Sequence, residues 1–327
     1  MRKKMMLYLK FIAILLVCVL TTVSILYCFG EYMAGAMTVY LKLDITDMFK
    51  NDVESKGFES DFMMCVVPDQ KNELEVENVS QSEPKAQVVS VNLSALSGKY
   101  ANYRGTSVIN NTDYDVTDLL YQEYKLPSEN NSDEPYILIY HTHTSEGYSD
   151  GGSVVDVGRE MKNEFEKLGY KTIHITEAFD SGQFSGSYSR SAVGVKKVLE
   201  KYPSIKLVFD VHRDSITDSS GVEYRPMTHI DGKSTAQVMF VCGTDEKGLE
   251  HPEWRENFKF ALDVSRNAGI MYGALSRPVN LRGDRFNTHF SNYSFLIEVG
   301  SAVNTLDEAK NAAVCTAKAI IGTIEKS

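Results

Sequence analysis

The chain is organised around the run Pro135-Tyr136-Ile137-Leu138-Ile139-Tyr140-His141-Thr142-His143-Thr144-Ser145-Glu146-Gly147-Tyr148, in which apolar residues give way to two histidines and a carboxylate. A short apolar run of this kind is typical of a buried parallel strand, and open α/β sheets carry their sites just beyond the carboxyl ends of such strands. The H-x-x-E spacing brings His143 and Glu146 within one turn of backbone, and zinc accepts both types of ligand. The run therefore predicts a strand that delivers metal ligands.

Two later segments combine a buried strand with a polar group in the same way. One apolar run ends at His212, and another contains Glu298. A carboxylate in such a run is costly to bury unless it is paired or takes part in chemistry. We expect His143, Glu146 and His212 to bind Zn²⁺ and to leave a fourth position for water. Glu298 would take a proton from that water and pass it to a leaving nitrogen, so the predicted chemistry is hydrolysis of an amide.

Helical and extended patterns alternate along this part of the chain. Apolar residues at helical spacing predict helices over residues 112–120, 153–168, 188–202, 253–275 and 306–324. Extended apolar runs predict strands over residues 135–140, 172–175, 205–211, 237–243, 278–281 and 294–300. This alternation predicts an α/β domain with a mostly parallel central sheet.

The amino terminus has the pattern of a membrane anchor. A cationic flank, residues 1–10, precedes residues 11–30, which carry no charged side chain. This length of about 20 residues suits a single membrane-spanning helix. A cleaved signal peptide is the alternative, because Ala34-Gly35-Ala36 resembles a cleavage site, but the uncharged run is longer than the usual ~7 to 15 residues. We expect an uncleaved anchor with its cationic flank in the cytoplasm and the rest of the chain on the outer face of the cell membrane.

The rest of the chain divides by composition. We expect a membrane-proximal segment over residues 31–67, a polar linker over residues 68–87 and one catalytic domain over residues 88–327. A chain of 327 residues with 43% hydrophobic content can bury one sizeable core. The formal net charge of -10 argues against nucleic acid as a partner.

The opening run, the segment Phe209-Asp210-Val211-His212-Arg213-Asp214-Ser215 and the segment Leu296-Ile297-Glu298-Val299-Gly300 together resemble the stage II sporulation protein P family. That family is related to the zinc-dependent N-acetylmuramoyl-L-alanine amidases, so the resemblance implies a three-layer αβα fold. It also implies cleavage of peptidoglycan, by amidase and endopeptidase activity, during engulfment of the forespore. The implied partners are stage II sporulation proteins D and M. The implied location is the mother-cell membrane, facing the space between the two membranes.

The same resemblance assigns roles position by position. The first zinc histidine of the amidases matches His143, the second matches His212, and the catalytic glutamate matches Glu298. The carboxylate ligand departs from the amidase pattern, in which it lies near the start of the following helix. In this sequence Glu146 follows His143 by three residues, a spacing that is similar to that of the zinc carboxypeptidases. We prefer Glu146 as the ligand and keep Glu160 as the alternative.

Other polar residues are candidates to support the site or to contact substrate: His141, Arg213, Asp214, Arg285 and His289. Either Arg213 or Arg285 could bind a peptide carboxylate. Alternation along an extended chain would point His141 the same way as His143, which makes His141 an alternative ligand. Arg213 and Asp214 follow His212 directly and could orient it or pair with one another.

Two other functions fit the same sequence. A zinc carboxypeptidase or endopeptidase acting on peptide stems would use the same ligands. A non-catalytic scaffold of the engulfment complex would need none of them. Because four candidate site residues stand at separate strand ends, the sequence favours an enzyme over a scaffold.

Overall fold

The computed structural model describes residues 88–93, 101–103, 106–122, 127, 129–131, 133–182 and 185–325. The predicted cationic flank, membrane span, membrane-proximal segment and linker, residues 1–87, lie outside this set. Among the described residues, no helix combines the length and the apolar character needed to cross a bilayer. All of the described residues lie within the predicted catalytic domain, residues 88–327.

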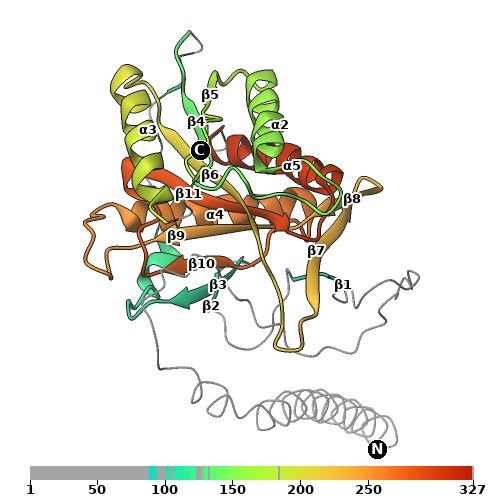
Figure 1. The fold of residues 1–327 in the computed structure, drawn as a ribbon. Coiled ribbons are helices and arrows are strands. Elements are labelled where there is room, and N and C mark those ends of the chain that lie inside the picture. Colours follow the sequence, from blue (N-terminus) through green and yellow to red (C-terminus); the bar gives the residue numbers. More distant parts are fainter. Residues whose placement is uncertain are drawn as a thin grey trace, which may run out of the picture. The chain divides into compact units, whose positions relative to one another are not determined.

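A mixed sheet forms the centre of the described chain, with strand order β2-β3-β10-β9-β11-β6-β4-β5 (Figure 1). The bounds of its strands are β2 (Ala101–Tyr103), β3 (Thr106–Asn111), β4 (Ile137–Tyr140), β5 (Thr172–His174), β6 (Leu207–Asp214), β9 (Val238–Gly243), β10 (Val279–Arg282) and β11 (Tyr293–Ser301). Neighbouring strands are parallel except at β9 with β11 and β2 with β3. The predicted α/β class with a mostly parallel sheet is confirmed.

Strand direction sets where a site can form. Strands β5, β4, β6 and β11 run one way, and β9, β10 and β3 run the opposite way. The carboxyl ends of β4, β6 and β11 therefore meet at one edge of the sheet, which is where a site is expected in a parallel sheet. The candidate residues of the opening run, of β6 and of β11 all belong to this edge.

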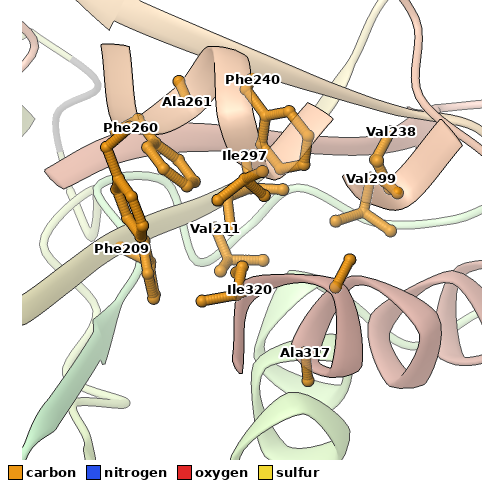
Figure 2. Close-up of a cluster of buried hydrophobic side chains, with 14 of the residues drawn as sticks. Phe209, Val211, Val238, Phe240, Phe260, Ala261, Ile297, Val299, Ala317 and Ile320 are labelled. Atoms are coloured by element: carbon orange, nitrogen blue, oxygen red, sulfur yellow. The ribbon is translucent and has the colours of Figure 1, made fainter. Parts of the chain in front are cut away.

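One face of the sheet is covered by α2 (Val154–Lys167), α4 (Trp254–Tyr272) and α5 (Leu306–Glu325). Figure 2 shows the core of this face, where Phe209 of β6, Phe240 of β9 and Ile297 of β11 meet side chains of α4 and α5. All three of these side chains are fully buried. Their burial removes a large apolar area from water, which is the dominant force that holds helices on a sheet.

The other face of the sheet carries the candidate site. Leu138 and Tyr140 of β4 and Val208 of β6 pack there against Val195 of α3 (Ser187–Lys201). Because side chains alternate along a strand, the residues of β6 that follow Val208 at steps of two lie on this face as well. Helices thus lie on both faces, and the polar residues of β6 and β11 point toward the side of α3.

A smaller sheet, of order β1-β7-β8, joins β1 (Val88–Val91), β7 (Glu223–Ile230) and β8 (Lys233–Ala236). β1 pairs in parallel with β7, and β7 turns back into β8 through Asp231 and Gly232, both at positive φ. The buried amide of Gln237 accepts a hydrogen bond from the backbone nitrogen of Leu93 at 2.6 Å. The start of the described chain is thereby attached to the main sheet.

The structure corrects two local predictions. The helix predicted over residues 112–120 is only the 3-10 turn η2 (Asp118–Tyr121), because Asn110 and Asp115 accept hydrogen bonds from nearby backbone nitrogens and so compete with helix formation. The strand predicted to end before His212 continues to Asp214, so His212 lies within β6 and not after it.

Candidate functional site

A tight turn after β4 presents the H-x-x-E motif. The backbone nitrogen of Glu146 donates to the carbonyl of His143 at 3.3 Å. Asp180 holds the turn from outside, because its carboxylate accepts hydrogen bonds from the hydroxyl of Thr144 at 2.6 Å and the backbone nitrogen of Ser145 at 2.9 Å. The two candidate ligands are therefore set by a closed and anchored turn.

His141 does not point the same way as His143, contrary to the alternation predicted from sequence, because β4 ends at Tyr140. Its Nδ1 lies 2.7 Å from the carbonyl of Val211, and its Nε2 lies 2.7 Å from Nε2 of His174. Burial lowers the pKa of His141 to about 4 and that of His174 to about 3, so both rings are neutral at pH 7. A carbonyl can only accept, so Nδ1 of His141 carries the proton and Nε2 accepts from His174. Neither nitrogen is left for a metal.

His143 faces the rest of the candidate site. Its side chain is almost fully buried. The centroid of its ring lies 5.4 Å from that of His212 and 5.7 Å from that of Tyr188, at the start of α3. The structure therefore brings together the two histidines that the sequence selected.

His212 is held between two carboxylates. Its Nε2 lies 2.8 Å from Oδ1 of Asp210, and its Nδ1 lies 3.3 Å from Oε2 of Glu146. Burial alone would lower the pKa of His212, but the charges of Asp210 and Glu146 outweigh burial and hold this pKa well above its usual value. In the metal-free protein the ring is therefore an imidazolium fixed on both sides.

Asp210 is fully buried and remains ionised. Burial favours its neutral form, but contacts with His212 and Thr142 outweigh burial and lower the pKa of Asp210 below its usual value. Thr142 donates to the two carboxylate oxygens from its backbone nitrogen at 2.9 Å and from its hydroxyl at 2.6 Å. Asp210 was not among the residues that the sequence singled out, although an acid in an apolar strand is the same signal that selected Glu298.

Glu298 stands beside His212 on the neighbouring strand, because the two residues are register partners in the parallel pair of β11 and β6. Burial and then the charge of Asp214 raise the pKa of Glu298 to about 8, although His212 opposes this effect. A carboxyl group with this pKa can gain and lose a proton near neutral pH. That property is the one required of a general acid–base catalyst.

Arg213 and Asp214 have different partners from those predicted. Arg213 donates its backbone nitrogen to Oε2 of Glu146 at 3.0 Å and its Nε to the carbonyl of Gly147 at 3.0 Å, so it orients Glu146. Asp214 forms a buried ion pair with Arg277 at 2.8 Å. Arg277 precedes β10 and reaches the site because its backbone nitrogen donates to a carbonyl of β9. No local sequence signal marked this arginine.

Three candidates lie apart from this cluster. Glu160 belongs to α2, which covers the opposite face of the sheet, so Glu146 is the carboxylate beside His212. His289 precedes β11 and faces His251, with 6.4 Å between ring centroids. His289 also lies before the start of β11, and the part of this strand from Tyr293 to Glu298 alone spans roughly 17 Å. Arg285 donates to the carbonyl of Glu250 at 3.2 Å, beside His289.

The donors suit zinc in type and, for one pair, in spacing. Two ligand atoms at about 2.0 to 2.1 Å from a tetrahedral zinc lie roughly 3.3 Å apart. Nδ1 of His212 and Oε2 of Glu146 are separated by 3.3 Å. Within the described residues, however, no group of three or more His, Cys, Asp or Glu side chains is arranged to hold a metal as it stands. Only His212 and Glu146 have the spacing of zinc ligands, and the ring of His143 lies next to that of His212.

The fold and this cluster define an α/β protein with two histidines and two carboxylates at the carboxyl edge of its parallel strands. A model of the stage II sporulation protein P family matches residues 39–321. The chain belongs to this family.

The chain is similar to one characterised relative and to several solved structures. Stage II sporulation protein P of Bacillus subtilis (strain 168) is 26% identical over 212 residues, which cover 57% of this chain and 50% of that protein. The chain thus matches about half the length of this relative. Among solved structures, an N-acetylmuramoyl-L-alanine amidase of Nostoc punctiforme has a TM-score of 0.37 at 12% identity, with 61% of this chain and 98% of that chain covered. An amidase of the same kind from Mycobacterium abscessus has a TM-score of 0.37 at 12% identity, with 59% and 98% covered.

Proposed function

We propose that this chain is a zinc-dependent hydrolase that cleaves amide bonds of peptidoglycan during forespore engulfment. The observation that carries the proposal is the pairing of Glu298 with His212 on adjacent strands, next to Glu146 and His143. Membership of the stage II sporulation protein P family supports the role in sporulation. The proposed activity is that of an N-acetylmuramoyl-L-alanine amidase, with endopeptidase activity as a second reaction of the same site.

His143, Glu146 and His212 would hold the zinc ion. Asp210 contacts Nε2 of His212, so Nδ1, which faces Glu146, is the nitrogen available for metal. A partner on the remote nitrogen fixes the orientation of a ligating histidine and raises its basicity. When bound, zinc lowers the pKa of water and polarises a carbonyl group.

Glu298 would move the proton. In its ionised form it would accept a proton from water, and in its protonated form it would deliver that proton to the leaving nitrogen of the cleaved amide. The ion pair of Asp214 and Arg277 lies next to it, and the negative charge of Asp214 contributes to the raised pKa. Each turnover would return Glu298 to its ionised form.

We further propose that residues 11–30 anchor the chain in the mother-cell membrane, with the catalytic domain facing the space between the two membranes. Stage II sporulation proteins D and M are the proposed partners. A net charge of -10 is compatible with an uncharged or cationic target in the cell wall.

One observation favours a second candidate reaction. Glu146, three residues after His143, is the carboxylate beside His212, and this spacing resembles that of zinc carboxypeptidases. Cleavage within peptide stems would follow from the same ligands. Mass spectrometry of the muropeptides released from cell wall separates the two reactions, because an amidase frees whole stem peptides and a peptidase shortens them.

The test combines metal analysis with activity. The purified full-length chain is expected to bind about one zinc ion, and Glu298→Gln should retain the metal but release no stem peptide from cell wall. Glu177→Gln is the matched control, because Glu177 is exposed and lies outside the cluster. Full activity of Glu298→Gln, or the lack of zinc in the wild-type chain, would refute the mechanism.

A further inference from the structure

A chain of buried polar side chains connects His212 with a distant loop. Asp210 contacts Nε2 of His212 and accepts from the hydroxyl of Thr142 at 2.6 Å. The hydroxyl of Thr142 lies 3.0 Å from that of Ser191 on α3, and Nδ2 of Asn287 lies 3.2 Å from the same Ser191 oxygen. All five side chains are at most 5% exposed, so water does not compete for these contacts. Residues from four separate segments thus form one connected path.

The hydrogen bonds along this path can all run in one direction, toward Asp210. The amide of Asn287 can only donate to Ser191 through Nδ2. Because the hydroxyl of Thr142 donates to Asp210, its oxygen is free to accept from the hydroxyl of Ser191, for which the carbonyl of Tyr188 at 3.2 Å is a second acceptor. When the Ser191 hydrogen points to Thr142, the donors of Asn287, Ser191 and Thr142 all point toward the carboxylate of Asp210, and hydrogen bonds aligned in this way strengthen one another in a buried environment. The path ends on the side of His212 that faces away from Glu146.

The loop at the far end of the path is strained. Phe286 and Asn287 have φ values of 48° and 57°, in the left-handed region, which a bulky residue such as phenylalanine rarely adopts and which asparagine tolerates better. Nδ2 of Asn287 also donates to the carbonyl of Tyr188 at 2.7 Å. The ring of Phe286 lies 5.9 Å from that of Tyr188, whose ring in turn faces His143. Backbone strain of this kind is kept where surrounding contacts require it, often at functional sites.

We propose that Asn287 is a positioning residue of the metal site, which it does not touch. Through Ser191, Thr142 and Asp210 it fixes the ring of His212 so that Nδ1 faces Glu146. The inference rests on the proposed function insofar as His212 binds zinc. Partners one contact removed from a metal ligand typically change metal affinity about 10- to 100-fold when they are lost. Because Asn287 acts through three intermediates, we expect a smaller loss, about 3- to 10-fold.

Two variants remove single links of the path. Asn287→Gly deletes the side chain and keeps a residue that tolerates positive φ, so the backbone of the loop is not strained further. Ser191→Ala deletes the middle hydroxyl. Asn267→Ala is the matched control, because Asn267 is also a buried asparagine that donates to a backbone carbonyl, at 2.8 Å, but lies in α4 on the opposite face of the sheet.

The experiment measures zinc affinity of the full-length chain by competition with a chromophoric chelator, and the ring nitrogen signals of His212 by NMR in the metal-free chain. Asn287→Gly and Ser191→Ala are both expected to weaken zinc binding about 3- to 10-fold and to shift the Nε2 signal of His212, whereas Asn267→Ala changes neither. Wild-type affinity and an unchanged His212 signal in both variants would overturn the inference. If the wild-type chain binds no zinc, the proposed function fails, and the NMR signal alone then decides whether Asn287 positions His212.

Discussion

Replacement of Glu298 by glutamine should stabilise the metal-free protein at alkaline pH and have little effect at acidic pH. In the folded protein, burial and Asp214 raise the pKa of Glu298 from 4.5 to about 8. The folded state therefore holds this proton more tightly than the unfolded state does. Stability falls as the pH rises from 4.5 toward 8, because ionisation of Glu298 favours the unfolded chain, and the loss is complete above pH 8. Glutamine resembles the neutral carboxyl group and carries no such penalty.

The size of this change in stability follows from the difference between the pKa of Glu298 in the unfolded chain, 4.5, and its pKa in the folded protein, about 8. About 3.5 pH units at about 1.36 kcal/mol each give an upper bound of about 5 kcal/mol. Glu298 keeps part of its side chain accessible to water, which screens the charge, so we expect about half of this bound. Glu298→Gln should thus gain about 2 to 3 kcal/mol over the wild type at pH 9, and less than about 1 kcal/mol at pH 5.

Urea unfolding with a chelator present measures this difference. The chain has a single tryptophan, Trp254, and its complete burial makes fluorescence a direct probe of unfolding. The exposed variant Glu177→Gln is the control and should show the same small effect at both pH values. If Glu298→Gln changes stability equally at pH 5 and pH 9, Glu298 is not the buried acid that the structure describes.

Two further substitutions test packing and charge around the site. Gly158→Ala would place a Cβ 2.6 Å from Nε2 of His141 and 2.8 Å from Nε2 of His174, so we expect a loss of about 1 to 3 kcal/mol in urea unfolding, and a neutral effect would contradict the buried histidine pair. Arg277→Met leaves the carboxylate of Asp214 buried without its partner and should cost about 3 to 5 kcal/mol. The companion variant Asp214→Asn removes the charge and should restore part of that stability in the double mutant; additive losses would argue against the ion pair.

The strands that carry the site could be predicted because they are buried on both faces. β4 is a continuous apolar run and β6 begins with one, Leu207 to Phe209, and such runs are recognisable in a parallel sheet. β1 alternates between exposed and half-buried residues, most of β7 is half-buried, and both contain polar side chains, so their pairing depends on contacts distant in sequence. The hydrophobic pattern of a short segment could not predict these two strands.

The structure brings together the ligand candidates that the sequence selected, but the residues that support them could not be predicted. His143 and His212 followed from position after or within an apolar strand. Arg277 lies 63 residues from the Asp214 carboxylate that it neutralises, and only the fold brings them together. His141 was assigned the direction of His143 because alternation was assumed to persist, but the chain turns where the strand ends. Side-chain direction in a turn depends on the contacts made there.

The position of β11 links the completion of the sheet to the completion of the candidate site. β11 is the last strand in the sequence, and it lies between β6 and β9, so it joins two groups of strands that otherwise share no ladder in the described chain (Figure 1). It also carries Glu298. A nascent or truncated chain without β11 lacks both the centre of its sheet and its proposed proton carrier. The candidate site is therefore complete only after β11 has been synthesised and has entered the sheet between β6 and β9.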